Sequence, residues 1–264
     1  MSLILVTNDD GIKSPGLLAA VEAVLPLGEV VVVAPSSQQT SAGRGLHGDK
    51  DGSLQRIDLN IGGRTVPAYH CDSSPASAVL HAFDVLFHER KPDLIVSGIN
   101  YGENLGSNIT ISGTVGAVLQ GASYGIPGLA MSLQTDIGNH RRHVKLEWAA
   151  ASHFCRMFAS MILTGPLPAD VDILNVNVPS VAAAKTPWKV TRLSRQNYFV
   201  NHMANPTSTS TIGEAVCRFG FDEALLEPDS DIQAICSNLV SVTPVSMDLT
   251  SRIDLKSFLG GGSG

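Results

Sequence analysis

The sequence predicts an α/β fold: a mostly parallel sheet with helices on both faces, followed by a β-hairpin or arm extension toward the C-terminus. Between residues 3 and 178, short apolar runs alternate with stretches of helical periodicity, which is typical of parallel sheets. The segment EVVVVAP (29–35) holds an unbroken apolar run, as strands covered on both faces do. After Pro179 the alternation stops, and strand-like pieces around a polar stretch predict a hairpin.

The elements expected in the first third of the chain alternate regularly. Residues 3–7 form a short buried strand that ends in an Asn-Asp-Asp-Gly turn, and Pro15 opens a helix that ends near Pro26. The apolar strand at 29–35 leads into a long, Gly-rich polar loop, and long ordered loops are often functional. The remaining expected elements of this part are strands at 54–62 and 64–71 and a helix at 73–89 with a Ser cap and an early Pro.

The second part of the chain repeats the alternation before it breaks. The elements expected here are a buried strand at 92–100, a Gly/Asn/Ser loop at 101–113, a helix at 114–125, a strand at 127–133, a long helix at 145–163 and a strand at 171–179. Strand-like pieces follow at 188–194 and 197–203, and a last strand with a polar ending lies within 239–251. We interpret His140 to His143 as a solvated loop.

Composition limits the possible partners. The 264 residues are 44% hydrophobic and 16% charged, which indicates a well-folded globular chain. The net charge of −6 argues against binding duplex nucleic acid, and no apolar run reaches the roughly 18 residues of a membrane span. The N-terminal residues enter a strand pattern without a basic leader, so we expect a cytoplasmic protein. The cysteines, Cys71, Cys155, Cys217 and Cys236, match no zinc spacing and are expected to be reduced thiols.

Three polar loops are expected at one edge of the sheet, because ligands of open parallel sheets bind at the carboxyl ends of the strands. The loops carry, respectively, Asn8, Asp9 and Asp10; residues 36–44; and Asn100, Asn104, Ser107, Asn108 and Ser112 to Thr114. All three offer carboxylate, amide or hydroxyl oxygens, which favour Mg²⁺, Mn²⁺ or Ca²⁺ over zinc. A cation there would also relieve the repulsion between the adjacent carboxylates of Asp9 and Asp10.

The segment Ser112-Gly113-Thr114 opens the predicted helix at 114–125. Free backbone N–H groups at a helix start suit an anion, so a phosphate site beside a metal is one interpretation. Two simpler interpretations stay open at this point. The Asp pair also fits a plain polar turn, and the Ser-Gly-Thr segment also fits an ordinary helix cap.

Five segments together resemble the survival protein SurE family: ILVTNDDGIKSPGL, VVVAPSSQQTSAGRG, PDLIVSGINYGENLG, SGTVGAVLQGASYGIPGLAMSL and VSVTPVSMDLT. They span nearly the whole chain. The resemblance implies a Rossmann-like core and a metal-dependent 5′/3′-nucleotidase with one divalent cation per subunit, Mg²⁺ or Mn²⁺. It also implies dimers or tetramers built through a C-terminal arm. On this basis the chain is one domain over 1–264, with an active-site core at 1–187, a protruding oligomerisation arm at 188–232 and a return to the core at 233–259.

The resemblance also implies individual site residues. The metal ligands are Asp9, Asp10, Asn100 and a hydroxyl, for which a gapless match gives Thr40, with Ser41 as second choice. The phosphate-side residues are Asn104, Ser112, Gly113 and Thr114.

The resulting hypothesis is a phosphomonoesterase that converts nucleoside monophosphates to nucleoside and phosphate, with Asp9 and Asp10 as the catalytic residues. A haloacid dehalogenase-type phosphatase is one alternative, but it requires DxDxT after the first strand. A receiver-like signalling module without turnover is another, but "PDLIVSGIN" ends in Asn where a phosphoacceptor Asp is needed, and "PGLAMSL" supplies no Lys. A dinucleotide-dependent oxidoreductase lacks its GxGxxG turn.

Overall fold

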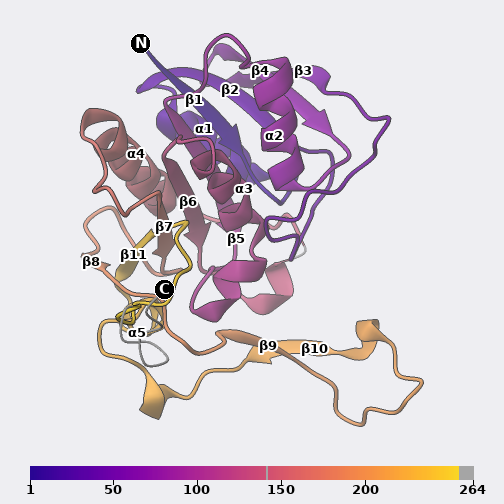
Figure 1. Ribbon diagram of the computed structural model, residues 1–264, viewed down its shortest axis with the longest axis vertical. Helices are drawn as coiled ribbons and strands as arrows, with labels where there is room; N and C mark the ends of the chain where they lie inside the picture. The colour runs from indigo at the N-terminus through magenta and orange to yellow at the C-terminus, as the bar shows by residue number, and fades with distance from the viewer. Residues whose placement is uncertain (141, 256–264) are drawn as a thin grey trace, which may run out of the picture.

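A nine-stranded mixed sheet organises the part of the chain that the computed structural model describes, residues 1–140 and 142–255 (Figure 1). Across the sheet the strands are β3 (Gln55–Ile61), β4 (Arg64–Cys71), β2 (Gly28–Pro35), β1 (Ser2–Thr7), β5 (Leu94–Tyr101), β6 (Gly128–Leu133), β7 (Ile173–Val178), β11 (Val240–Val245) and β8 (Trp188–Val190). The neighbours from β4 to β7 all pair in parallel, whereas β3 and β11 run antiparallel to β4 and β7. The predicted α/β fold with a mostly parallel sheet is confirmed.

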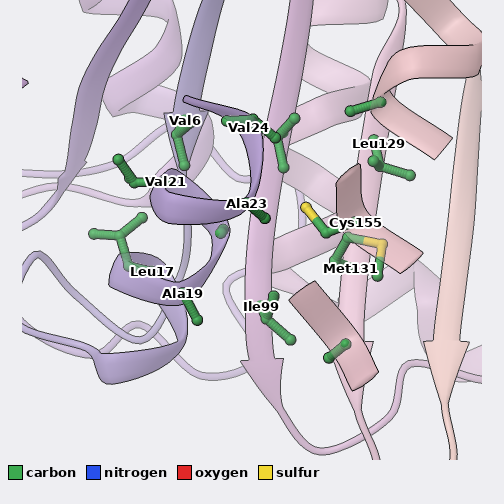
Figure 2. Close-up of a cluster of buried hydrophobic side chains, with 14 of the residues drawn as sticks. Val6, Leu17, Ala19, Val21, Ala23, Val24, Ile99, Leu129, Met131 and Cys155 are labelled. Atoms are coloured by element: carbon green, nitrogen blue, oxygen red, sulfur yellow. The ribbon is translucent and has the colours of Figure 1, made fainter. Parts of the chain in front are cut away.

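Helices cover both faces of the sheet, as predicted. On one face, α1 (Pro15–Val24) and α4 (Ala149–Thr164) pack on the strands, and Figure 2 shows α1 side chains such as Leu17 and Val21 in this core with Met131 and Cys155. On the other face lie α2 (Pro75–Val85) and α3 (Gly113–Ala122). None of the helices in the described residues is both long and apolar enough to cross a bilayer.

The helix predicted at 145–163 begins later than expected, at Ala149. The residues before it are used in another way, because the hydroxyl of Tyr101 donates to the carbonyl of Val144 and its ring packs edge-on against Trp148. These contacts tie the segment before the helix to the end of β5.

The sheet changes its direction of growth between β1 and β5. From β1 the chain adds β2 and then β4 on one side, and it returns to add β5, β6 and β7 on the other. The crevice at the carboxyl ends of such a pair of strands is the usual ligand site of open α/β sheets. The loops that follow β1, β2, β5 and β6 all leave the sheet at this edge.

The hairpin predicted near the C-terminus is present as β9 (Phe199–His202) and β10 (Val216–Phe219), which pair antiparallel and extend away from the sheet (Figure 1). Its base packs with α5 (Asp231–Cys236) through buried Leu105, Tyr198 and Ile232. The segment assigned to the arm starts with β8, which belongs to the main sheet, so the chain leaves the sheet only after Val190. The return at 233–259 adds β11 to the sheet, and its residues 256–259 lie outside the described part of the chain.

Candidate active site

The turn after β1 holds two acidic side chains in a buried position. Asn8 closes this turn, because its amide donates to the carbonyl of Gly11 and accepts from the Gly11 N–H, both at 3.1 Å. Gly11 has a φ of +93°, a conformation that favours glycine. Asp9 and Asp10 are only 7% and 3% exposed, so the turn places two adjacent carboxylates out of solvent at the switch point of the sheet.

Asp9 is held by the start of α3. Its Oδ1 accepts a 2.6 Å hydrogen bond from the hydroxyl of Thr114. Gly113 allows this close approach, since a Cβ there would lie 2.7 Å from the Cβ of Asp9. Burial raises the pKa of the Asp9 carboxyl, and hydrogen bonds from the Thr114 side chain and backbone oppose that shift.

Asp10 connects two other loops. Its Oδ2 accepts from the backbone N–H of Tyr101 at 3.2 Å, and its Oδ1 accepts from Nε2 of Gln38 at 2.9 Å. The same Gln38 amide also donates to the carbonyl of His140 at 2.7 Å. Burial, and then the neighbouring charge of Asp9, raise the pKa of the Asp10 carboxyl. The pair therefore costs free energy when both groups are ionised and no cation is near.

The donor set around this pair suits a hard cation. Among the described residues no Lys, Arg or His makes an ion pair with Asp9 or Asp10, and no group of three His, Cys, Asp or Glu side chains converges there. Further ligands must come from amide or hydroxyl oxygens. Asn100 is oriented by its Nδ2, which donates to the carbonyl of Gly102 at 2.7 Å, so that Oδ1 is left to serve as a ligand. Oxygen ligands of this kind fit a hard divalent cation.

The structure brings both candidate hydroxyls to the same cavity. Thr40 and Ser41 are exposed and both line it together with Asp9 and Asp10. Ser41 has a φ of +63°, which is uncommon for a residue with a side chain. The choice of Thr40 over Ser41 therefore stays a prediction.

The predicted phosphate-side residues divide into two groups. Asn104 and Ser112 line the cavity, and Ser112 also caps α3 by accepting from the Val115 N–H at 3.1 Å. Thr114, in contrast, directs its hydroxyl at Asp9. The start of α3 thus compensates the charge of Asp9 through Thr114, and the role of Asn104 and Ser112 toward a phosphate stays a prediction.

Strand β7 fixes the backbone of Asn104. The Asn104 N–H donates to Oδ1 of Asn177 at 2.7 Å, and its carbonyl accepts from Asn175 at 2.9 Å and from Asn177 at 3.1 Å. Its own side chain donates to the hydroxyl of Ser132 at 2.8 Å. Two neighbouring strands therefore hold the third loop in place.

Several residues of the cavity were missed by the sequence analysis. The cavity has a volume of about 580 Å³, and besides the predicted residues it is lined by Gln38, Glu103, His140, Arg142 and Phe199, among others. The interpretation of 140–143 as a merely solvated loop was incomplete, because His140 is partly buried and lines the cavity; Arg141 lies outside the described residues. The clustering of Gln38 with Thr40 in one loop was a usable signal for Gln38, whereas Phe199 reaches the site only through the placement of the hairpin.

A family model described as "Survival protein SurE" matches residues 4–200. The chain belongs to the SurE family. SurE relatives include a protein named 5′-nucleotidase SurE from Thermococcus gammatolerans, 39% identical over 96% of this chain and 93% of that protein. Another of the same name, from Methanothermobacter thermautotrophicus, is 42% identical over 75% of each chain. The crystal structure of the SurE protein from Aquifex aeolicus superposes with a TM-score of 0.77 at 31% identity, covering 97% of this chain and 98% of that one. The resemblance stated from the sequence is confirmed.

Proposed function

We propose that this SurE family member is a metal-dependent phosphomonoesterase that hydrolyses nucleoside monophosphates to nucleoside and phosphate. The name 5′-nucleotidase, which its relatives share, supports this activity. The comparisons give no support to the receiver-like or haloacid dehalogenase-type alternatives. Hydrolysis of the 3′-monophosphates is part of the proposal.

The observation that carries the proposal is the buried acidic pair beside a helix start. Asp9 and Asp10 have raised pKa values, chiefly because they are buried, and the described residues supply them no cationic partner. A plain polar turn would not bury two carboxylates at this cost. A divalent cation compensates both charges and attracts a phosphate to the same place.

We propose that one divalent cation, Mg²⁺ or Mn²⁺, is held by Asp9, Asp10, Asn100 and the hydroxyl of Thr40. When bound, such a cation polarises a phosphate oxygen and lowers the pKa of a bound water. Burial of Asp9 and Asp10 keeps competing solvent away from the carboxylates. Gln38 and the Tyr101 N–H keep both oxygens of Asp10 in a fixed orientation.

The remaining residues of the site bind and orient the substrate. Ser112 and Asn104 line the cavity at the third loop and can donate to the phosphate oxygens. The backbone N–H of Gly113, in the first turn of α3, is a further donor for a phosphate. Thr114 acts through Asp9, which it holds by its hydroxyl.

The test is phosphate release from a panel of nucleoside 5′- and 3′-monophosphates in EDTA, Mg²⁺ or Mn²⁺. We expect release only with a divalent cation, and a loss of at least about 100-fold in kcat for Asp9→Asn. Val181→Ala is the matched surface control, because this exposed side chain lies outside the cavity. Full turnover by Asp9→Asn in saturating metal would refute the assignment of the site.

We also propose that the protein is cytoplasmic and self-associates into dimers or tetramers through the arm. The support is the exposed apolar surface of the hairpin region, where Ile212, Phe219 and Leu225 are all more than half exposed. Light scattering on the wild type and on Ile212→Asp tests the association. A monomeric wild type would contradict it.

A further inference from the structure

The cavity at the acidic pair is lined by two chemically different sets of side chains. The polar set includes Asp9, Asp10 and Asn100. The apolar set includes Ile111, from the segment before α3, and Phe199 and Val216, from the hairpin. A volume of about 580 Å³ lies within the range of cavities that enclose a small organic ligand, roughly 300–1,000 Å³.

Two of the apolar side chains that line the cavity are largely exposed to solvent. Ile111 and Val216 are 51% and 68% exposed, although each is a large aliphatic side chain. They come from segments about a hundred residues apart in the sequence, and both face the same cavity. An exposed apolar patch inside a polar-rimmed cavity is typical of a ligand-binding surface.

The hairpin side of this cavity is fixed to the loop that carries the predicted phosphate site. The side chain of Asn108 donates to the carbonyl of Phe199 at 3.1 Å and accepts from its N–H at 2.9 Å, as a neighbouring strand would. One residue earlier, the hydroxyl of Tyr198 donates to buried Glu103 at 2.6 Å. These hydrogen bonds therefore hold the hairpin in place as one wall of the cavity.

The ring of Phe199 meets a second ring at this wall. Its centroid lies 5.2 Å from that of His140, with the two planes at 76°. His140 in turn packs over Gly102, where a Cβ would lie 2.5 Å from the imidazole Nε2. A planar group that enters the cavity therefore finds aromatic and aliphatic side chains there as well as carboxylates.

We propose that the wall formed by Ile111, Phe199 and Val216 binds the base of the substrate, so that the arm determines which phosphate esters are preferred. The inference rests on the proposed function and deepens it, because it assigns the base and the phosphate to different residues of the same cavity. A phosphate ester without a planar heterocycle lacks the group that would contact this wall. Base-on-aromatic contacts typically change affinity by roughly tenfold or more.

The experiment compares kcat/KM for adenosine 5′-monophosphate with that for ribose 5-phosphate, which has the same phosphate and sugar but no base. We expect the ratio to fall roughly tenfold or more in Phe199→Ala and in Ile111→Ser, while kcat/KM for ribose 5-phosphate stays unchanged. Val181→Ser is the matched control, since this 71% exposed aliphatic residue lies outside the cavity and outside the arm, and its ratio should equal that of the wild type.

Each outcome of this comparison either supports or overturns the proposal. An unchanged ratio in both wall variants, an equal loss on both substrates, or a wild type that prefers ribose 5-phosphate overturns the base-binding wall. If Phe199→Ala does not fold, Ile111→Ser carries the test, because Ile111 is half exposed. If the wild type hydrolyses no ester at all, the proposed function fails. Calorimetry with adenosine then still tests the wall: weaker binding by Ile111→Ser supports it, and equal or absent binding contradicts it.

Discussion

Replacing Asp10 by Asn should change the stability of the metal-free protein and its activity in opposite directions. The substitution keeps the size of the side chain and removes one charge from a buried pair. In EDTA we expect Asp10→Asn to be more stable than the wild type. With Mg²⁺ or Mn²⁺ we expect the order to reverse, because only the wild type gains a tightly held cation.

The magnitude follows from the ionisation of Asp10. Its carboxyl has a pKa of 3.8 without perturbation, and burial with the adjacent Asp9 charge raises it to about 8. Near neutral pH this corresponds to at most about 4 kcal/mol of destabilisation in the metal-free protein. Asn has only one acceptor oxygen for the Tyr101 N–H and the Gln38 amide, so one of these donors loses its partner, which lowers the gain in stability by about 1–3 kcal/mol. A net gain of about 2 kcal/mol should raise Tm by roughly 4–8 °C.

The pH dependence of the stability difference between Asp10→Asn and the wild type tests the sign of this effect. A carboxyl with a pKa raised by folding destabilises the protein only where the unfolded chain would ionise it, so this destabilisation is absent below the pKa of the unfolded chain. It grows as the pH rises toward about 8, the pKa of Asp10 in the folded state. The advantage of Asp10→Asn in EDTA should therefore be small at about pH 5 and largest near about pH 8.

The assay is thermal unfolding in EDTA and in saturating Mn²⁺, with phosphate release measured on the same samples. At a cation concentration of about 100 times Kd the wild type should gain about 2.7 kcal/mol, and Asp10→Asn should gain almost nothing. Val181→Ala should follow the wild type in both buffers. If Asp10→Asn is less stable than the wild type in EDTA, the carboxylate is a structural acceptor and the reasoning fails.

Two further substitutions test the groups that position the site. Thr114→Val removes the hydroxyl that donates to Asp9 and should weaken Mn²⁺ binding roughly 10- to 100-fold in a metal titration, with Thr114→Ser restoring it. Unchanged Mn²⁺ affinity would show that Asp9 needs no such support. Asn177→Ala removes two of the bonds that hold the backbone of Asn104, and should cost about 1–3 kcal/mol in denaturant unfolding and raise KM more than it lowers kcat. A loss in kcat alone would place Asn177 in the chemical step instead.

The sheet was predictable because its strands can be recognised from local sequence patterns. The run at β2 and the Asn-Asp-Asp-Gly turn after β1 need only neighbouring residues to be recognised, and the helix after Ser74 begins with its own cap, which accepts from the Ser77 N–H. The start of α4 was predicted too early, because the residues before Ala149 are held by contacts with Tyr101, which is distant in the sequence. Local patterns contain no information of that kind.

The site was predictable in part for the same reason. Asp9 and Asp10 stand out because adjacent carboxylates need an explanation, and Asn100 lies at the end of a recognisable strand. The role of Thr114 as the donor to Asp9 was not visible, since a Ser-Gly-Thr start fits a cap and an anion site equally well. Phe199 was also not visible, because contacts between residues far apart in the sequence, such as Asn108 with Phe199 and Glu103 with Tyr198, bring the hairpin to the cavity.

The two acidic residues are not equivalent. Asp9 is fixed by the rigid start of α3, through the hydroxyl and the backbone of Thr114, so its position is set before any ligand binds. Asp10 is held by the end of β5 and by Gln38, a residue of the polar loop after β2. Because Gln38 also donates to the carbonyl of His140, a cation held by Asp10 would also act on the loop after β6. We therefore expect metal binding at Asp10 to be coupled to the shape of the cavity, whereas Asp9 is held in place by Thr114.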